Sequence, residues 1–432
     1  MKTRGIIFII IAAAIPWIWY GPLAAAGSGA AVSQYLGAVS LILMGITQLM
    51  ATRIKGIEAF FGSMDRVYVL HKWLAIGALG AAFLHNGIDA ELGNIVLSGR
   101  LEDGAEDVGE LAYNGMIWLI ITSLITIIPY KYWKWSHRLL GLFFALAAYH
   151  YIFVAKPFAV ISAPGLYITA FCLMGILSYL YLLVPRMFGH NSKKYQVESV
   201  IQHKDVTEIN MRPEGRGISH KAGQFAFVNF DPIMLQEVHP FTISSAPQPD
   251  GNLRFLVKGL GSYTKRLGKT LEKGATARVS SPFGHFSLRP TKGPQVWVGG
   301  IGITPFMAWA EALPAEWPSP THLYYCVPTS GDGLYVDDFE ATARKVENFD
   351  SSLCASKEGK RLNAKQIMAD LEGDIRDAHV YFCGPIGMRD ALKQGLVNEG
   401  LRPSHFHYEE FEMRTGVGVI PFLRRIWLYF NS

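Results

Sequence analysis

The chain has 432 residues, of which 50% are hydrophobic and 17% charged, and its formal net charge at pH 7 is +5. These averages combine two unlike parts, because long apolar runs dominate up to about residue 186 and shorter alternating patterns follow. The small positive charge does not indicate a nucleic-acid partner, because no basic patch with interleaved aromatic residues occurs in the sequence. The four cysteines form no CxxC pair and indicate neither a metal site nor a disulfide framework.

Six apolar runs in the first part are each close to the length of about 20 residues that a bilayer requires. They cover residues 5–27, 33–52, 67–87, 113–130, 137–154 and 164–185. The first run can also be a cleaved signal peptide, although its apolar region is long for one. Cleavage there would not change the orientation of the following spans. The sequence therefore predicts an all-α, six-helix transmembrane domain over residues 1–190.

Two of these runs each contain a pair of histidines. His71 and His85 are 14 residues apart in the third run, and His137 and His150 are 13 apart in the fifth. Ionisable side chains inside a lipid-spanning helix are costly and usually functional. At a rise of about 1.5 Å per residue, the members of each pair lie roughly 20 Å apart along the helix axis. If both helices run in the same direction, each histidine faces one on the other helix, and each facing pair can ligate a haem iron.

Small residues lie between the paired histidines. They are Gly77, Ala78, Gly80 and Gly141. They would let two flat macrocycles approach the backbone, or they would simply allow close helix packing in lipid. The spacing of 13 residues leaves His150 off the face of His137, so the fifth helix would need a local distortion, for which Gly141 is a suitable place.

The charges in the loops predict the orientation of the six spans. Basic residues collect at Lys2, Arg4, Arg53, Lys55, Arg66, Lys131, Lys134, Arg186, Lys193 and Lys194. The alternate connections contain few of them, and residues 89–110 are acidic. Both ends of the unit are therefore expected in the cytoplasm, and the third and fifth helices run parallel from inside to outside. His71 and His137 then belong to the cytoplasmic layer. His85 and His150 belong to the outer layer.

Residues 194–291 change to short alternating strands. These are residues 195–201, 206–211, 224–230, 241–244, 253–257 and 276–280. Six short strands separated by turn residues predict a small antiparallel β-barrel.

From residue 294 onward strands alternate with helical patterns. The strands are residues 295–298, 322–327, 349–354, 379–383 and 405–408. This alternation predicts a doubly wound parallel α/β domain over residues 294–411. The first strand is followed by the glycine-rich turn 299–305, which can hold a pyrophosphate or serve as a structural strand-to-helix turn. A second turn, residues 383–385, follows the fourth strand.

Five motifs occur in a characteristic order. They are HPFTISSAP at 239–247, GSYT at 261–264, SPFG at 281–284, GGIGITP at 299–305 and CGP at 383–385. In this order they resemble the ferredoxin-reductase type of module. Joined to a six-helix, two-haem membrane part, they resemble the NADPH oxidase and ferric reductase superfamily, especially the compact prokaryotic NADPH oxidases. The resemblance covers roughly residues 5–411, and its combination of motifs is specific although each motif is weak singly.

The resemblance implies an FAD site in the barrel domain. The residues that would hold FAD are His239, Pro240, Phe241, Thr242, Lys258, Gly261, Ser262 and Thr264. Thr242 would lie near the reactive edge of the flavin. Family members often have Arg at position 239, so Lys258 is included as a further phosphate partner. Gly261, Ser262 and Thr264 would cradle the diphosphate.

The resemblance also implies a nucleotide site at the edge of the parallel sheet. Its residues would be Gly299, Gly300, Gly302, Thr304, Pro305, Cys383, Gly384 and Pro385. Cys383 and Gly384 would lie beside the nicotinamide. Phe411 matches an aromatic residue that lies against the flavin ring in this family, or it is a buried structural residue. Thr242, Cys383 and Phe411 are thus the expected catalytic residues.

Two stretches depart from the family pattern. Family members that use NADPH often have an Arg soon after the second strand of the nucleotide sheet, whereas residues 327–332 contain no basic residue. NADH therefore remains an alternative to NADPH, although Lys357 or Arg361 could supply the missing charge. The tail 412–432 mixes large apolar residues with two arginines and can lie on the membrane surface or pack against the nucleotide domain.

The resemblance implies a flavocytochrome b of the cell membrane. It would pass electrons from cytoplasmic NAD(P)H through FAD and two b-type haems to an acceptor outside. Dioxygen giving superoxide is the first expected acceptor, because the histidine spacing and the HPFT run resemble the oxidase branch. A ferric chelate is an alternative, because its reduction needs only an exposed outer haem edge. A haem-binding membrane subunit that feeds a partner protein or a quinone is a third alternative, against which the intact flavin and nucleotide module argues.

Overall fold

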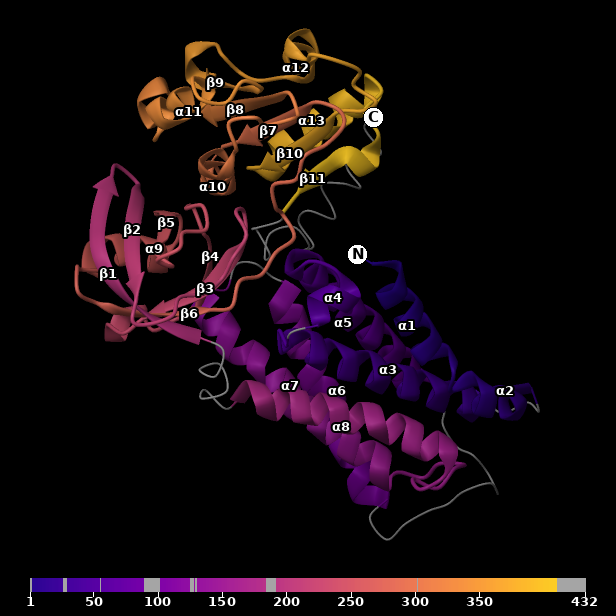
Figure 1. Cartoon of the computed structure of the whole chain (residues 1–432). Helices are drawn as coiled ribbons and strands as arrows, with labels where there is room; N and C mark the ends of the chain where they lie inside the picture. Colours follow the sequence, from indigo (N-terminus) through magenta and orange to yellow (C-terminus); the bar gives the residue numbers. More distant parts are fainter. Residues whose placement is uncertain are drawn as a thin grey trace. The chain divides into compact units, whose positions relative to one another are not determined.

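The computed structural model describes residues 2–25, 29–54, 56–88, 102–124, 128, 130–183, 192–300 and 302–409. The chain forms two compact units, one within residues 1–187 and the other within residues 188–410 (Figure 1). The first unit is helical. The second contains two β-sheets with their helices.

The first unit is a bundle of helices. They are α1 (Thr3–Ala14), α2 (Trp17–Ala25), α3 (Gly29–Ala51), α4 (Ile57–Phe61), α5 (Met64–Gly87), α6 (Glu102–Leu124), α7 (Tyr130–Phe153) and α8 (Ala163–Leu183). Helix α3 packs against α5 and α8, and α6 packs against α7. The buried core of this unit includes Ile42, Ile46 and Phe144.

Only some of these helices are apolar enough, by length and composition, to cross a membrane. Among the described residues, α3, residues 66–87 of α5, and α8 meet this criterion. Helices α1 and α2 meet it together, although they are bent by 41°. The break falls at Pro16, which lacks a backbone N–H and cannot continue the hydrogen-bond ladder of α1. The predicted fourth and fifth spans correspond to α6 and α7, which carry charged residues in their first turns and do not meet the criterion.

Two sequence-based expectations about α6 and α7 need correction. Helix α6 begins at Glu102 and ends at Leu124, whereas the apolar run predicted a span over 113–130. The acidic residues 102–110 were expected in the connection between two spans, whereas they form the first turns of α6. Carboxylates are stabilising there because the N-terminus of a helix carries partial positive charge. Helix α7 runs as one element through Gly141. A side chain there would overlap the ring of Tyr179, so Gly141 allows close packing against α8 and does not mark a break.

The FAD-type domain is an antiparallel β-barrel, as the sequence predicts. Its strands are β1 (Ser192–His203), β2 (Val206–Pro213), β3 (Phe225–Phe230), β4 (His239–Thr242), β5 (Leu253–Lys258) and β6 (Thr276–Ser280). Their order is β4-β3-β6-β1-β2-β5, and a bridge between Ile243 and Phe255 joins the two ends of the sheet. Helix α9 (Ser262–Thr270) follows β5. Tyr195, Phe230 and Phe255 are buried in the barrel core.

The nucleotide-type domain is a five-stranded parallel sheet with helices between the strands. Its strands are β7 (Gln295–Gly299), β8 (Thr321–Val327), β9 (Phe349–Ala355), β10 (His379–Cys383) and β11 (Phe406–Tyr408). Its helices are α10 (Thr304–Ala312), α11 (Val336–Ala343), α12 (Ala364–Asp370) and α13 (Ile386–Asn398). The strand order is β11-β10-β7-β8-β9 (Figure 1). The strand that comes first in the chain, β7, therefore lies in the middle, with β8 and β9 on one side and β10 and β11 on the other. The crevice between the carboxyl ends of β7 and β10 is therefore the expected ligand position.

Candidate cofactor and nucleotide sites

The four histidines of α5 and α7 lie in two facing pairs. The ring centroids of His71 and His137 are 6.2 Å apart, and those of His85 and His150 are 6.4 Å apart. Two metal–nitrogen bonds of about 2 Å, with half a ring on each side, give a separation of about 6 Å. The structure thus brings the histidines together in the combination that their spacing predicts, and both separations fit one metal ion between two imidazoles.

Helix α3 holds the two histidine rings of α5. The Nδ1 atom of His71 lies 3.0 Å from the carbonyl oxygen of Thr47. The Nδ1 atom of His85 lies 2.9 Å from the carbonyl oxygen of Ser33. Because a carbonyl oxygen only accepts, Nδ1 carries the proton in both rings and the lone pair of Nε2 is left for a metal.

Helix α6 holds the two histidine rings of α7 in the same way. The Nδ1 atom of His150 lies 2.8 Å from the carbonyl oxygen of Ala105, and that of His137 lies 3.1 Å from Oγ of Ser123. Ser123 donates its own proton to the carbonyl oxygen of Leu119 at 2.7 Å, so it accepts from His137. All four rings therefore have the tautomer that haem ligation through Nε2 requires.

The small residues near the histidines fall into two groups. A methyl group added to Gly80 would meet no described atom within 4 Å, and one on Gly77 would only touch Leu43 at 3.8 Å. These two glycines are therefore not required by helix packing. Gly109 of α6, which no motif in the sequence marks, has no room for a side chain because the ring of His150 occupies that position.

The HPFT run and the N-terminus of α9 lie side by side in the barrel domain. The run forms β4, and the ring of His239 stacks on that of Tyr263 with a centroid distance of 3.8 Å. Gly261 is the N-cap of α9, and its N–H donates to Oγ1 of Thr264 at 3.0 Å. The free N–H groups and the dipole of this helix N-terminus favour an anion such as a diphosphate.

The expected charge partners in this region already have carboxylate neighbours. Nζ of Lys258 lies 3.1 Å from Oδ2 of Asp205. Nε2 of His239 lies 3.4 Å from Oε2 of Glu237. Binding of a phosphate by Lys258 would require the first of these pairs to open. The helix N-terminus of α9 is therefore the better supported phosphate position.

The two turns of the nucleotide-type domain meet at the carboxyl ends of β7 and β10. Gly299 is opposite Cys383 in the parallel ladder, and the N–H of Gly300 donates to the carbonyl oxygen of Cys383 at 3.1 Å. A side chain on Gly302 would overlap the sulfur of Cys383. Cys383 is 1% exposed, and burial raises the pKa of its thiol. It is therefore a neutral packing group and not a thiolate nucleophile.

Two helices begin at these turns. Thr304 and Pro305 are the first residues of α10, and Gly384 and Pro385 immediately precede α13. Both helix N-termini lie at the carboxyl edge of the sheet, where their N–H groups can contact a pyrophosphate. Phe411 and the tail 412–432 lie outside the described residues.

The turn after β8 has carboxylate partners. The N–H and hydroxyl of Thr329 donate to Oδ2 of Asp332 at 3.1 and 2.7 Å. The N–H and hydroxyl of Ser330 donate to Oε1 of Glu358 at 2.7 and 3.1 Å. The donors that could hold a ribose 2′-phosphate at this strand end are thus engaged with two carboxylates. Lys357, a candidate from the sequence, is exposed at the surface.

These features fit a module that binds FAD and a nicotinamide dinucleotide, joined to a helical unit with helices long and apolar enough to cross a membrane. Comparisons with known families agree with this class. The profile of the ferric reductase like transmembrane component matches residues 36–148, that of an FAD-binding domain matches 190–300, and that of an oxidoreductase NAD-binding domain matches 298–394. Together with the similarity to an NADPH oxidase described next, these matches show that the chain belongs to the NADPH oxidase and ferric reductase superfamily. The prediction of this family is confirmed.

Individual relatives cover parts of the chain. The toluate 1,2-dioxygenase electron transfer component of Pseudomonas putida is 29% identical over 206 residues, which are 45% of this chain and 61% of that protein. NADPH oxidase 1 of Mus musculus is 32% identical over 141 residues, which are 31% of this chain and 23% of that protein. A flavohemoglobin from Malassezia yamatoensis has a TM-score of 0.50 at 15% identity, with 92% of this chain and 98% of that one covered. That last likeness concerns the fold alone.

Proposed function

We propose that the protein is a transmembrane flavocytochrome b that passes electrons from cytoplasmic NAD(P)H to an acceptor outside the cell membrane. The observation that carries this proposal is the pair of histidine layers in which every Nδ1 is engaged and every Nε2 is available. When bound, FAD would supply hydride acceptance, and two b-type haems would supply single-electron transfer. The histidines would hold the two irons, His71 with His137 and His85 with His150.

The residues of the second unit would bind and orient the other two molecules. The N-terminus of α9 would hold the FAD diphosphate, and Thr242, which is buried at the end of β4, would lie near the reactive edge of the flavin. The N-termini of α10 and α13 would hold the dinucleotide. The close contact of Gly302 with Cys383 would keep the backbone of both turns near the nicotinamide. In the family pattern Phe411 would cover the flavin ring.

The charge distribution in the loops supports the orientation of the protein. Basic residues at the ends of the helical unit would lie on the cytoplasmic side, and the acidic segment 89–110 outside. The His71 layer would then be nearer to the cytoplasm than the His85 layer. The FAD and nucleotide domains, which follow the sixth span, would lie in the cytoplasm.

The haem assignment is tested by the haem content of the purified full-length protein. The wild type is expected to show a b-type spectrum with two haems per chain. His85→Ala is expected to retain one haem, because only the outer pair loses a ligand. His190→Ala, a histidine that follows the helical unit in the sequence, serves as the matched control and should retain both haems. Unchanged haem content in His85→Ala would rule out the ligand assignment.

Dioxygen is the acceptor we propose first, in keeping with the similarity to NADPH oxidase 1. Aerobic NAD(P)H consumption should produce superoxide, which a probe inhibited by superoxide dismutase detects. Consumption only after a ferric chelate is added would favour the alternative, a ferric-chelate reductase. Consumption only after a quinone or a partner protein is added would favour the third candidate.

NADH is the electron donor that the turn after β8 favours. Asp332 is ion-paired with Lys204, whereas Glu358 places negative charge beside the turn, and repulsion by Glu358 would weaken NADPH binding. Measurement of NADH and NADPH as donors in the same assay tests this preference. A lower KM for NADPH would assign a phosphate-binding role to Lys357 or Arg361 instead.

A further inference from the structure

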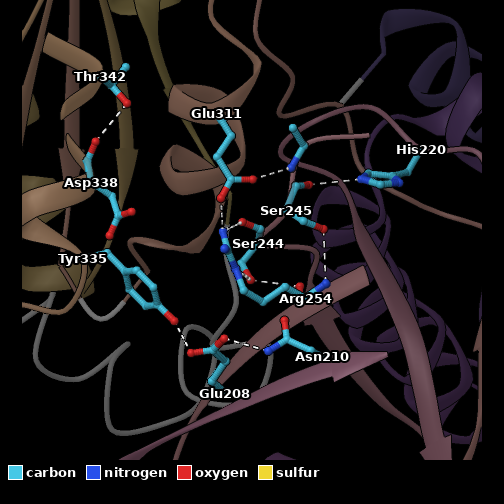
Figure 2. Close-up of polar contacts among 11 residues, drawn as sticks. Glu208, Asn210, His220, Ser244, Ser245, Arg254, Glu311, Tyr335, Asp338 and Thr342 are labelled. Carbon is cyan, nitrogen blue, oxygen red and sulfur yellow. Dashed lines mark hydrogen bonds and ion pairs between the residues drawn. The ribbon is translucent and has the colours of Figure 1, made fainter. Parts of the chain in front are cut away.

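A polar network joins the FAD barrel to the nucleotide-type domain (Figure 2). Arg254 of β5 forms an ion pair with Glu311 in the last turns of α10. The second carboxylate oxygen of Glu311 accepts the N–H of Ala246, which belongs to the barrel, at 3.0 Å. Both oxygens of this one side chain are therefore bound by the opposite domain.

A second contact between the two domains lies next to the first. The hydroxyl of Tyr335, which follows β8 and precedes α11, donates to Glu208 of β2. Glu208 is 6% exposed and also accepts from Asn210 at 2.8 Å. The guanidinium of Arg254 lies 5.4 Å from the centre of the Tyr335 ring, so the two contacts share one cationic side chain.

The network contacts elements that also carry residues of both candidate binding sites. On the barrel side, Arg254 donates to the carbonyl oxygen of Ser244 at 2.7 Å, two residues after Thr242. On the nucleotide side, Glu311 lies in the last turn of α10, and the first residues of this helix, Thr304 and Pro305, belong to the glycine turn. Tyr335 has a left-handed backbone with φ of 61°, which a residue with a side chain adopts only when its surroundings hold it.

We propose that Arg254, Glu311, Tyr335 and Glu208 are positioning residues that fix the nucleotide-type domain against the FAD barrel for hydride transfer. Two domains of one chain ordinarily move relative to each other unless their interface holds them. Hydride transfer requires a near-attack separation of about 3 to 3.5 Å, and an error of about 1 Å can cost roughly 100-fold in rate. A network that connects the end of the HPFT run to α10 would limit that error. The proposal rests on the proposed binding of FAD and NAD(P)H.

The test measures flavin reduction by NADH in the full-length protein in detergent, under anaerobic conditions and by stopped flow. Glu311→Gln is expected to lower the limiting rate about tenfold. The NADH concentration at half-saturation should change less than twofold, because the nucleotide turn is intact. Glu316→Gln removes an equivalent charge from the exposed loop after α10 and should leave the limiting rate unchanged.

Further variants separate positioning from general loss of structure. Tyr335→Phe removes only a hydroxyl and is expected to lower the limiting rate with normal FAD content. The double variant Arg254→Gln/Glu311→Gln should be little slower than Arg254→Gln, because that single variant already removes the ion pair. Unchanged limiting rates in Glu311→Gln and Tyr335→Phe would overturn the proposal, as would losses explained entirely by missing FAD. Flavin reduction requires neither haem nor an external acceptor, so failure of the proposed electron route would leave this test intact.

Discussion

Gly302 shows how one missing side chain can determine the geometry of a site. A methyl group there would overlap the sulfur of Cys383, which is itself buried at the end of β10. Gly302→Ala is therefore expected to push the two turns apart, to destabilise the protein by about 1 to 3 kcal/mol and to slow flavin reduction by NADH. Thermal unfolding and stopped-flow reduction measure the two effects. Gly29→Ala at the start of α3, where a methyl group has open space, is the control and should show neither.

Ser123 is a single residue of the helical unit that is expected to determine the geometry of the proposed site around His137. It is the side-chain acceptor for Nδ1 of His137, and loss of such a partner typically lowers metal affinity about 10-fold to 100-fold. Ser123→Ala should therefore release haem from the His71 layer faster, as measured by transfer to an apoprotein that binds haem tightly. Ser178→Ala removes a serine whose hydroxyl donates to the carbonyl oxygen of Met174 in the preceding turn of α8, and it should leave release unchanged. Equal release rates in both variants would contradict the orienting role.

At the scale of elements, three histidines are in contact beside β10 and β11: His379 of β10, His407 of β11, and His405 in the turn that immediately precedes β11. Nδ1 of His379 lies 3.0 Å from Nε2 of His407, and the ring of His405 stacks on His379 with a centroid distance of 4.0 Å. Burial, together with the neighbouring histidines, lowers the pKa of His407 to about 4. The unfolded chain, with an ordinary histidine pKa of about 6.5, then binds more protons between these two values.

These histidines predict a stability that falls as the pH drops. Because the unfolded state binds the extra proton, the free energy of unfolding decreases between about pH 6.5 and 4. Allowing for partial exposure, the loss is expected to be about 1 kcal/mol. His407→Gln should flatten this part of the profile of unfolding midpoint against pH in the full-length protein. His285→Gln, in the barrel domain, is the control and should retain the wild-type slope.

Comparison of the observed helices and strands with the predicted ones shows which of them can be recognised from the sequence. All six barrel strands and all five parallel strands occur where the sequence predicts them. Alternating burial marks strands such as β5, and a short apolar run between turn residues marks strands that are buried on both faces, such as β7. Apolar runs do not indicate the start of α6, because its first turns are polar. A search for such runs detects only the apolar part of a helix. Gly141 was misassigned because close packing against Tyr179 depends on a helix far along the chain.

At the scale of the molecule, the proposed orientation gives a direct prediction about access to NADH. The FAD and nucleotide domains would face the cytoplasm, so intact cells should not oxidise added NADH through this protein. Inverted membrane vesicles should oxidise it without detergent. Permeabilised cells, in which both membrane faces are accessible, provide the control for the amount of enzyme. Oxidation by intact cells that equals the permeabilised rate would reverse the orientation.

The candidate sites were predictable only where their chemistry lies in side chains of special type or spacing. The four histidines and the glycine turns stand out in the sequence. The carbonyl oxygens of Thr47 and Ala105 leave no signal, because every residue has a carbonyl group. The contact of Arg254 with Glu311 joins residues 57 positions apart, and nothing near either residue in the sequence indicates it.

Each histidine ring is held by a hydrogen bond from the helix that packs against its own helix, α3 for α5 and α6 for α7. This arrangement has a consequence for assembly. Helices α3 and α5 would form one half of both proposed haem sites, and α6 and α7 would form the other half. Each half could then orient its two rings before the other half is present, so cofactor insertion would not need a finished bundle. Iron bound between the halves would then join them, and the protein made under haem shortage would be more open to proteolysis along that seam.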